Sequence, residues 1–121
     1  MNNFKNLEIW QMAKSLTKDI YQITKKFPKE ELFSITNQIK RSCVSIPANI
    51  AEGSGRNSPK EFIQFLSISN GSSTELDTLL EICLDIEYIS KEEYMLLNEK
   101  IERVQKMNRK LQESIKIKHK L

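Results

Sequence analysis

Apolar residues recur at three- and four-residue steps over most of the chain, which is the spacing of amphipathic α-helices. A first helix is predicted over about residues 7–27, where Pro28 ends it. A second is predicted to begin near Lys29 or Glu30 and to end at Gly53, and a third over about residues 58–88. A fourth begins at Ser90, which opens a capping box, and continues on a heptad pattern.

Short connections between these helices indicate that consecutive helices are antiparallel neighbours. The sequence therefore predicts an all-α fold, an antiparallel up-down-up-down four-helix bundle with long third and fourth helices. This bundle forms a single domain over residues 1–121. Asn108 is a polar residue on the heptad seam of the fourth helix, a position where asparagine commonly fixes register or partner number.

The third predicted helix has an unusually wide apolar face, which fills an arc of roughly 200° on a helical wheel. One bundle contact needs about half of that, so the arc predicts burial on two sides. Small residues within it are expected to let neighbouring helices approach closely, with a hydroxyl-based site as the alternative: Ser69, Ser72 and Ser73. The remaining flank carries an acidic stripe that requires a basic neighbour: Asp77, Glu81 and Asp85.

The junction between the second and third helices holds two of the three prolines and two of the three glycines of the chain. Pro47 lies inside the apolar pattern, where it lacks an amide donor and crowds the carbonyl of Cys43, so we expect a kink there. Gly53 is expected to take the left-handed conformation that ends a helix. Ser58 then restarts a helix as its N-cap, with Glu61 closing a capping box.

The composition places the chain among mostly helical proteins, with only three glycines and three prolines in 121 residues. It contains no apolar run of about eighteen residues, and its start lacks the apolar core of a signal peptide, so no membrane span is expected and the expected location is the cytoplasm. Cys43 and Cys83 lack metal-ligand spacing and are interpreted as buried thiols, a disulfide or a site being the alternative.

Charge is segregated along the chain although its net value is only +3. Residues 1–60 carry ten Lys and Arg against five acids, and residues 91–121 carry nine against five. Residues 61–90 carry six acids and no Lys or Arg. An acidic segment between two basic ones predicts complementarity within or between subunits as readily as an external partner.

The sequence offers little for catalysis. His119 is the only histidine and lies near the end of the chain, so a catalytic triad or a histidine metal site has no credible member. Gly53 and Gly55 form a lone G-x-G after a helix rather than a strand, which argues against a dinucleotide site, and no P-loop sequence is present. We therefore expect a protein that is not an enzyme and that needs no cofactor or metal.

Basic clusters make nucleic acid a better candidate. On the fourth helix, Arg103, Lys106 and Lys110 lie at i, i+3 and i+7 on the side away from the seam, with Arg109 adjacent. Such a stripe can follow phosphates. The alternative is a solvated helix face whose basic residues pair with Glu99 and with a second glutamate at i, i+4 spacing.

Two further clusters complete the set of candidate phosphate contacts. Lys40 and Arg41 are adjacent on the second helix, while Arg56 and Lys60 flank the positive N-terminal end of the third. An anion is one interpretation of the second pair. The favoured interpretation is structural, with Arg56 pairing with Glu52 or Glu61 to hold the turn.

The segments QIKRSCVSIPANIAEGSGR and KEFIQFLSISNGSSTEL, with LEIWQMA near the start, resemble the bacterial four-helix-bundle family also called the 23S rRNA-intervening-sequence protein family. The resemblance is strongest in the I-P-x-N-I-A-E-G-x-G-R segment, and no catalytic residue is assigned to the family. A related group is the accessory protein of diversity-generating retroelements, a pentameric barrel that associates with a reverse transcriptase and nucleic acid. The resemblance thus implies a homopentamer.

Two functions follow as hypotheses. The first is an oligomeric accessory factor that binds the RNA or DNA backbone through its pooled basic surface. The second is a protein-interaction scaffold whose acidic and basic helix faces meet across subunits, without a nucleic-acid role.

Overall fold

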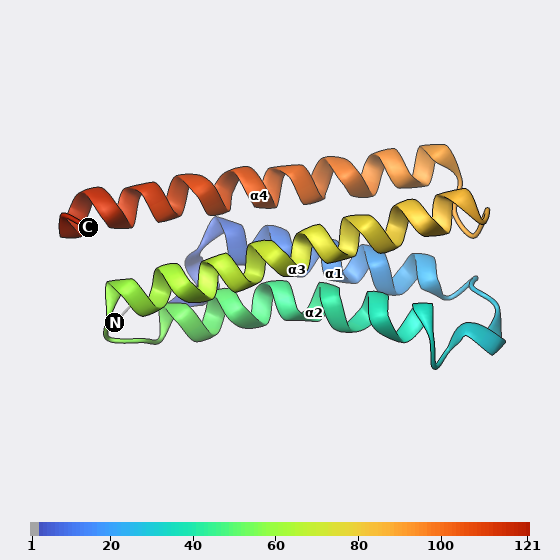
Figure 1. Cartoon of the computed structure of the whole chain (residues 1–121), viewed down its shortest axis with the longest axis horizontal. Helices are drawn as coiled ribbons and strands as arrows, with labels where there is room; N and C mark the ends of the chain where they lie inside the picture. Colours follow the sequence, from blue (N-terminus) through green and yellow to red (C-terminus); the bar gives the residue numbers. More distant parts are fainter. Residues whose placement is uncertain (1–2) are drawn as a thin grey trace.

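The structure, a computed structural model, describes residues 3–121 and contains two short 3₁₀ segments and four α-helices in that range (Figure 1). The all-α fold predicted from the apolar pattern is confirmed. The elements are η1 (Phe4–Asn6), α1 (Glu8–Thr24), η2 (Lys29–Glu31), α2 (Ile35–Ser54), α3 (Pro59–Asp85) and α4 (Lys91–His119). None of the described helices is both long enough and apolar enough to cross a membrane.

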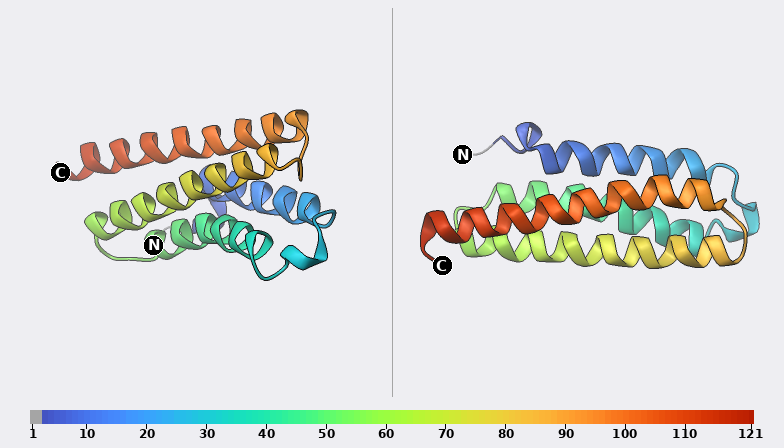
Figure 2. Two further views of the ribbon diagram at one scale, coloured as in Figure 1. Left: turned by 45° about the vertical axis from the view of Figure 1, so that its right-hand side comes forward. Right: turned by 90° about the horizontal axis from the view of Figure 1, so that it is seen from above.

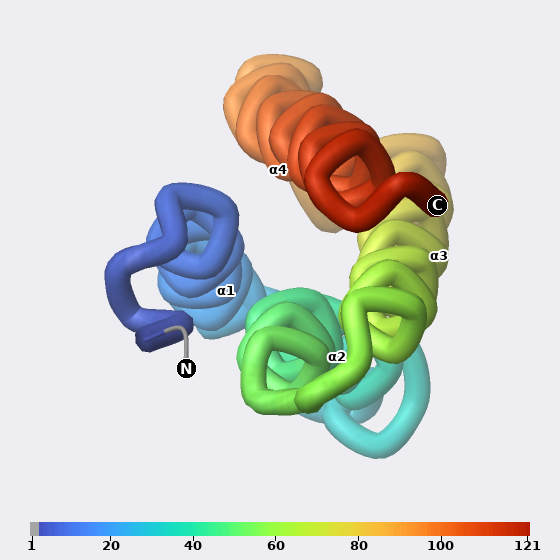
Figure 3. Tube along the Cα trace, turned by 90° about the vertical axis from the view of Figure 1, so that its left-hand side faces the viewer, coloured from blue at the N-terminus to red at the C-terminus, as the bar shows by residue number. Residues whose placement is uncertain are grey.

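Each helix contacts the helices next to it in the chain, and α4 returns to contact α1. Figure 3 looks along the bundle and shows this order around its axis, and both views of Figure 2 show the helices running lengthwise beside one another. Two ion pairs join α1, and the turn that directly follows it, to α4: Asp19 with Lys100, and Lys26 with Glu93. Because the residue that comes later in the chain at α1 pairs with the residue that comes earlier on α4, these two helices are antiparallel.

The core lies on the axis of the bundle and draws from every helix. Burial of each large aliphatic side chain contributes on the order of 1.5–3 kcal/mol, and packing rather than helix propensity therefore stabilises the fold. The large aliphatic side chains that are fully buried are Leu16, Ile20, Ile39, Ile46, Ile50, Leu66, Leu76, Leu80, Ile101 and Val104.

The second helix begins later than predicted. Lys29–Glu31 forms a 3₁₀ turn, and α2 starts only after Ser34, whose backbone at φ −124° and ψ −110° is not helical. The hydroxyl of Ser34 donates to the carbonyl of Glu31, which stabilises the turn. Leu32 and Phe33 lie before α2 and therefore do not contribute to its buried face, and they are 45% and 91% exposed.

Gly53 is a packing residue rather than a left-handed cap, so that prediction was wrong. It lies inside α2, which ends at Ser54, and no described glycine has a positive φ. A Cβ atom on Gly53 would lie 2.6 Å from Cβ of Phe65 and 3.0 Å from Cδ1 of Phe62. Only glycine fits this close approach of α2 to α3.

Serine hydroxyls join α3 to α2. Ser69 donates to the carbonyl of Ile46 at 3.0 Å, and Oγ of Ser72 lies 2.9 Å from Oγ of Ser45. Small side chains thus allow the helices to approach closely, as predicted, and their hydroxyls are engaged in helix–helix contacts.

A polar seam fixes the register of α3 and α4. The buried Asn108 donates through Nδ2 to the carbonyl of Leu66 at 2.8 Å, which is the register role expected of it. Asp77 accepts from the hydroxyl of Tyr94 at 2.7 Å and from Nδ2 of Asn98 at 3.1 Å. The expectation of a basic neighbour was therefore wrong for Asp77, whose partners are neutral.

The turn between α3 and α4 is defined by caps at both helix ends. Ser90 and Glu93 form the capping box predicted for α4. Helix α3 ends earlier than predicted because Glu87 takes a left-handed φ of 63°, and the N–H of Tyr88 donates to the carbonyl of Cys83 at 2.8 Å. This arrangement is a Schellman motif, which satisfies the last carbonyls of the helix.

The wide apolar face of α3 is buried on two sides, as predicted, because α3 packs against both α2 and α4. One edge of this face extends beyond both contacts and leaves Ile68, Ile82 and Ile86 between 43% and 48% exposed. No other helix among the described residues covers this edge.

Candidate functional site

Four of the predicted site residues are cations in the middle of α4, the largest number on any one helix. Arg103, Lys106, Arg109 and Lys110 are all exposed, and we call them the basic ridge. The heptad seam positions between them, Val104 and Asn108, are buried and fix the outward orientation of the ridge.

No carboxylate pairs with the basic ridge. Among residues 3–121 no ion pair within 4.0 Å involves any of its members, so the predicted pairs of Arg103 with Glu99 and of Lys106 with Glu102 are not formed. The acidic stripe is also remote, because Asp77 meets α4 at Tyr94 and Asn98, nearer the other end of that helix.

The ridge borders a hollow on each side of α4. Arg103 and Lys106 line a groove of about 1030 Å³ between α1 and α4, whose apolar floor includes Ile23 and Leu97. Arg109 lines a smaller hollow of about 270 Å³ on the side of α3. The groove is mixed in charge, since Asp19, Glu93, Glu99 and Glu102 also line it.

Lys40 and Arg41 do not form one cluster. Lys40 is half-buried, with Nζ 5.0 Å from the centre of the Tyr21 ring, a cation–π contact between α2 and α1. Arg41 is exposed.

Arg56 holds the turn between α2 and α3, as the structural interpretation predicted. Its guanidinium pairs with Glu52 at 2.6 Å and Glu61 at 3.8 Å, and lies 5.0 Å from the centre of the Phe65 ring. Because the carboxylate of Glu61 faces Arg56, it does not close the predicted capping box, although its N–H bonds to the hydroxyl of Ser58. Lys60 is exposed on the first turn of α3.

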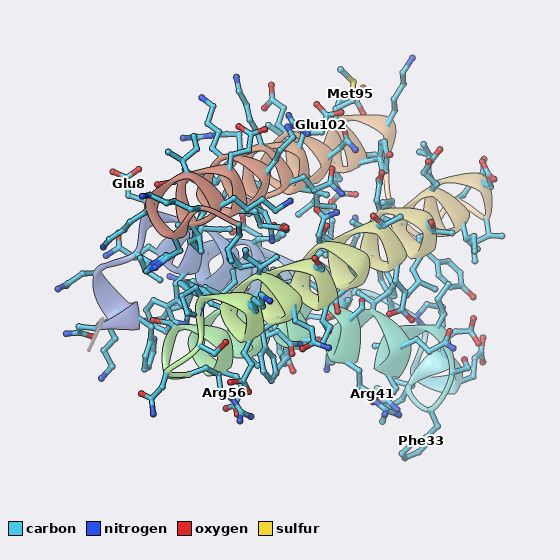
Figure 4. All side chains as sticks on the ribbon, turned by 60° about the vertical axis from the view of Figure 1, so that its left-hand side comes forward. Glu8, Phe33, Arg41, Arg56, Met95 and Glu102 are labelled. Carbon is cyan, nitrogen blue, oxygen red and sulfur yellow. The ribbon has the colours of Figure 1, made fainter. Side chains whose placement is uncertain are left out.

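The predicted residues do not all share one side of the molecule. Figure 4 shows Arg41 and Arg56 on the side opposite α4, from which Met95 and Glu102 project. These two arginines are therefore separate from the basic ridge.

The described residues contain no group of three His, Cys, Asp or Glu placed to hold a metal ion. The thiols are equally unsuited to chemistry. Burial raises the pKa of Cys43 to about 12 and that of Cys83 to about 11, so both are neutral at physiological pH. Both are free and buried, as predicted.

One group of neighbouring residues could not be predicted from the sequence. Ser54, Lys118 and His119 come together at the end of the bundle although more than sixty positions separate the serine from the other two. Only the packing of α4 along the whole length of α3 brings them together.

Comparison with known proteins supports the fold. The family model of the 23S rRNA-intervening sequence protein matches residues 5–110. The chain belongs to this family. Among solved structures it is similar to a protein with unknown function from the S23 ribosomal protein family of Bacteroides thetaiotaomicron, at 27% identity and a TM-score of 0.81. That match covers 87% of this chain and 95% of the other.

No curated protein matches the chain. The family match spans Lys40, Arg41, Arg56, Lys60 and the basic ridge. The last turns of α4, with Lys118 and His119, lie beyond it.

Proposed function

We propose that this protein is a non-enzymatic accessory factor that binds the phosphate backbone of RNA or DNA through the basic ridge. The observation that carries the proposal is that all four ridge cations are exposed and no carboxylate within residues 3–121 pairs with them. Unpaired cations along one helix release counterions when they meet phosphates, which gives affinity without base readout. The family name, which refers to ribosomal RNA genes, agrees with an RNA partner.

Homo-oligomerisation is the second part of the proposal. The exposed isoleucines of α3 (Ile68, Ile82 and Ile86) form an apolar surface that a second copy of the chain would cover. Several copies would multiply the ridge, so that a net charge of only +3 per chain becomes a substantial positive field. A homopentamer is the assembly that the family resemblance implies.

A matched pair of triple variants tests the ridge. Arg103→Gln, Lys106→Gln and Lys110→Gln together remove three charges from it. The control, Lys25→Gln, Lys29→Gln and Lys91→Gln, removes three exposed charges near the opposite end of α4. Fluorescence anisotropy with a labelled RNA and DNA strand should show a large loss of affinity for the ridge variant and a small one for the control. Equal losses would contradict a ridge-specific interface.

The alternative function is a protein-interaction scaffold in which acidic and basic faces meet across subunits. Glu81 and Asp85 favour it, since both are exposed and neither forms an ion pair within the described chain. Under this hypothesis, reversing Glu81 and Asp85 to lysine dissociates the oligomer in sedimentation experiments. An assembly that survives the reversal while RNA binding changes would exclude the scaffold.

A further inference from the structure

A cavity of about 480 Å³ lies at the end of the bundle where the α2–α3 turn meets the last turns of α4. We call it the terminal cavity. Leu7, Phe62 and Leu111 contribute an apolar wall, while Arg56, Lys118 and His119 contribute nitrogen donors. In Figure 1 this is the end at which the chain terminates, beside the turn that leads into α3.

The charged side chains that line the terminal cavity are basic. No aspartate or glutamate is among the residues that line it, in contrast to the groove between α1 and α4, which has four acids in its wall. Arg56 does pair with Glu52 and Glu61, but a guanidinium has five N–H donors, and these contacts leave donors free. The cavity therefore favours an anion.

The backbone adds donors at the same place. The terminal cavity includes Asn57, Ser58 and Pro59, the turn that opens α3. The N–H groups of Asn57 and Ser58 donate no hydrogen bond to any acceptor within residues 3–121. They stand at the N-terminal end of a helix of 27 residues, where the helix dipole also favours negative charge.

Ser54 supplies an independent observation. It lines the terminal cavity, is only 5% exposed, and its Oγ has no hydrogen-bond partner. Buried hydroxyls are normally paired, because an unpaired one loses its bonds to water without replacement. The Oγ atom itself is enclosed, so a ligand oxygen would become its missing partner once the Ser54 side chain turns toward the cavity.

We propose that the terminal cavity binds a phosphate monoester carried on an aromatic or apolar group. Cations, backbone donors and the Ser54 hydroxyl would hold the phosphate, and Phe62 and Leu111 would contact the attached group. This chemistry is shared by a free nucleoside monophosphate and by the 5′-phosphorylated end of a nucleic-acid strand. The site is separate from the proposed backbone interface, since no residue of the basic ridge lines it.

Titration calorimetry with adenosine 5′-monophosphate, and with adenosine as the matched control, tests the proposal. The monophosphate should bind with a Kd of about 1 mM or tighter, and adenosine should not bind measurably. Ser54→Ala should weaken the binding about tenfold while raising the melting temperature of the ligand-free protein, because it removes an unpaired buried hydroxyl. Ser67→Ala, at an exposed position of α3, should leave the affinity for the monophosphate unchanged, and the change in its melting temperature measures the gain in helix propensity alone.

Absence of monophosphate binding, or an unchanged affinity in Ser54→Ala, would overturn the proposal.

A 5′-phosphorylated oligonucleotide compared with its 5′-hydroxyl form identifies the source of the phosphate. A clear preference for the phosphorylated strand indicates a strand end, and equal affinities with retained monophosphate binding indicate a free nucleotide. The triple variant of the basic ridge should still bind the monophosphate. The proposal of a backbone interface and the proposal of a phosphate site in the cavity can therefore be tested independently. Loss of monophosphate binding in that variant but not in Ser54→Ala would also overturn the proposal.

Discussion

The hydroxyl of Thr17 on α1 lies 3.1 Å from the carbonyl oxygen of Cys43 on α2. In a regular helix this carbonyl accepts from the amide of residue 47, but Pro47 has no amide hydrogen. Thr17 also donates to the carbonyl of Ala13 at 2.9 Å, so its one proton is shared. The proline defect of one helix is thus compensated by the side chain of its neighbour.

This relationship predicts coupling between Thr17 and Pro47. Thr17→Val keeps the shape of the side chain but leaves the carbonyl of Cys43 without a donor, and should cost about 1–2 kcal/mol of unfolding free energy. In a Pro47→Ala background the amide returns, and the same substitution should cost much less. Urea denaturation of the two single variants and the double variant measures this coupling. Equal costs in both backgrounds would show that the contact is incidental.

Gly53 and Gly71 provide a matched pair on adjacent helices. Gly53→Ala places a methyl group 2.6 Å from Cβ of Phe65 and should destabilise the protein by about 1–3 kcal/mol. Gly71→Ala meets nothing within 4 Å and should stabilise it by about 0.5–1 kcal/mol, since alanine favours the helix. Thermal unfolding of both variants checks these signs. A neutral Gly53→Ala would contradict the close approach of α2 and α3.

The Lys26–Glu93 pair predicts a dependence of stability on pH. The pKa of Glu93 lies below its ordinary value, first because of its bond from Lys26 and then because of the N–H of Ser90. A carboxyl with a lowered pKa stabilises the fold above its unfolded-state pKa of about 4.3, and this contribution is lost as the pH falls through the folded pKa.

Glu93→Gln should therefore flatten the fall in unfolding free energy between about pH 5 and pH 3. It retains an acceptor for the capping box of α4, so helix capping is largely preserved. The neighbouring Glu92, which is exposed, provides the control, and Glu92→Gln should retain the dependence of the parent protein. If Glu93→Gln had the same acid profile as the parent, the ion pair would have no energetic role.

Local signals were sufficient to predict most of the helix boundaries. Ser58 and Ser90 act through bonds to their own neighbours, so the sequence alone indicates where α3 and α4 start. Asn108 could also be assigned, because a polar residue on an apolar seam needs a partner on the facing helix.

Features that depend on contact between distant residues could not be predicted. Gly53 was predicted to be a helix cap. Its actual role depends on Phe65, which lies on another helix and which the local sequence does not indicate. Asp77 carried no sign that its partners would be Tyr94 and Asn98 rather than a cation. For the candidate site, the sequence predicted which residues of α4 face outward, but not that Lys40 would lie over Tyr21.

The central claim is that the basic ridge binds a phosphate backbone, and the salt dependence of binding tests it most directly. Anisotropy titrations of one RNA strand over a series of salt concentrations give the slope of log K against log[salt]. If Arg103, Lys106 and Lys110 each contact a phosphate, their triple replacement should make this slope shallower by about 2 for a single strand. An affinity that does not depend on salt, or a slope unchanged in the variant, would contradict the account.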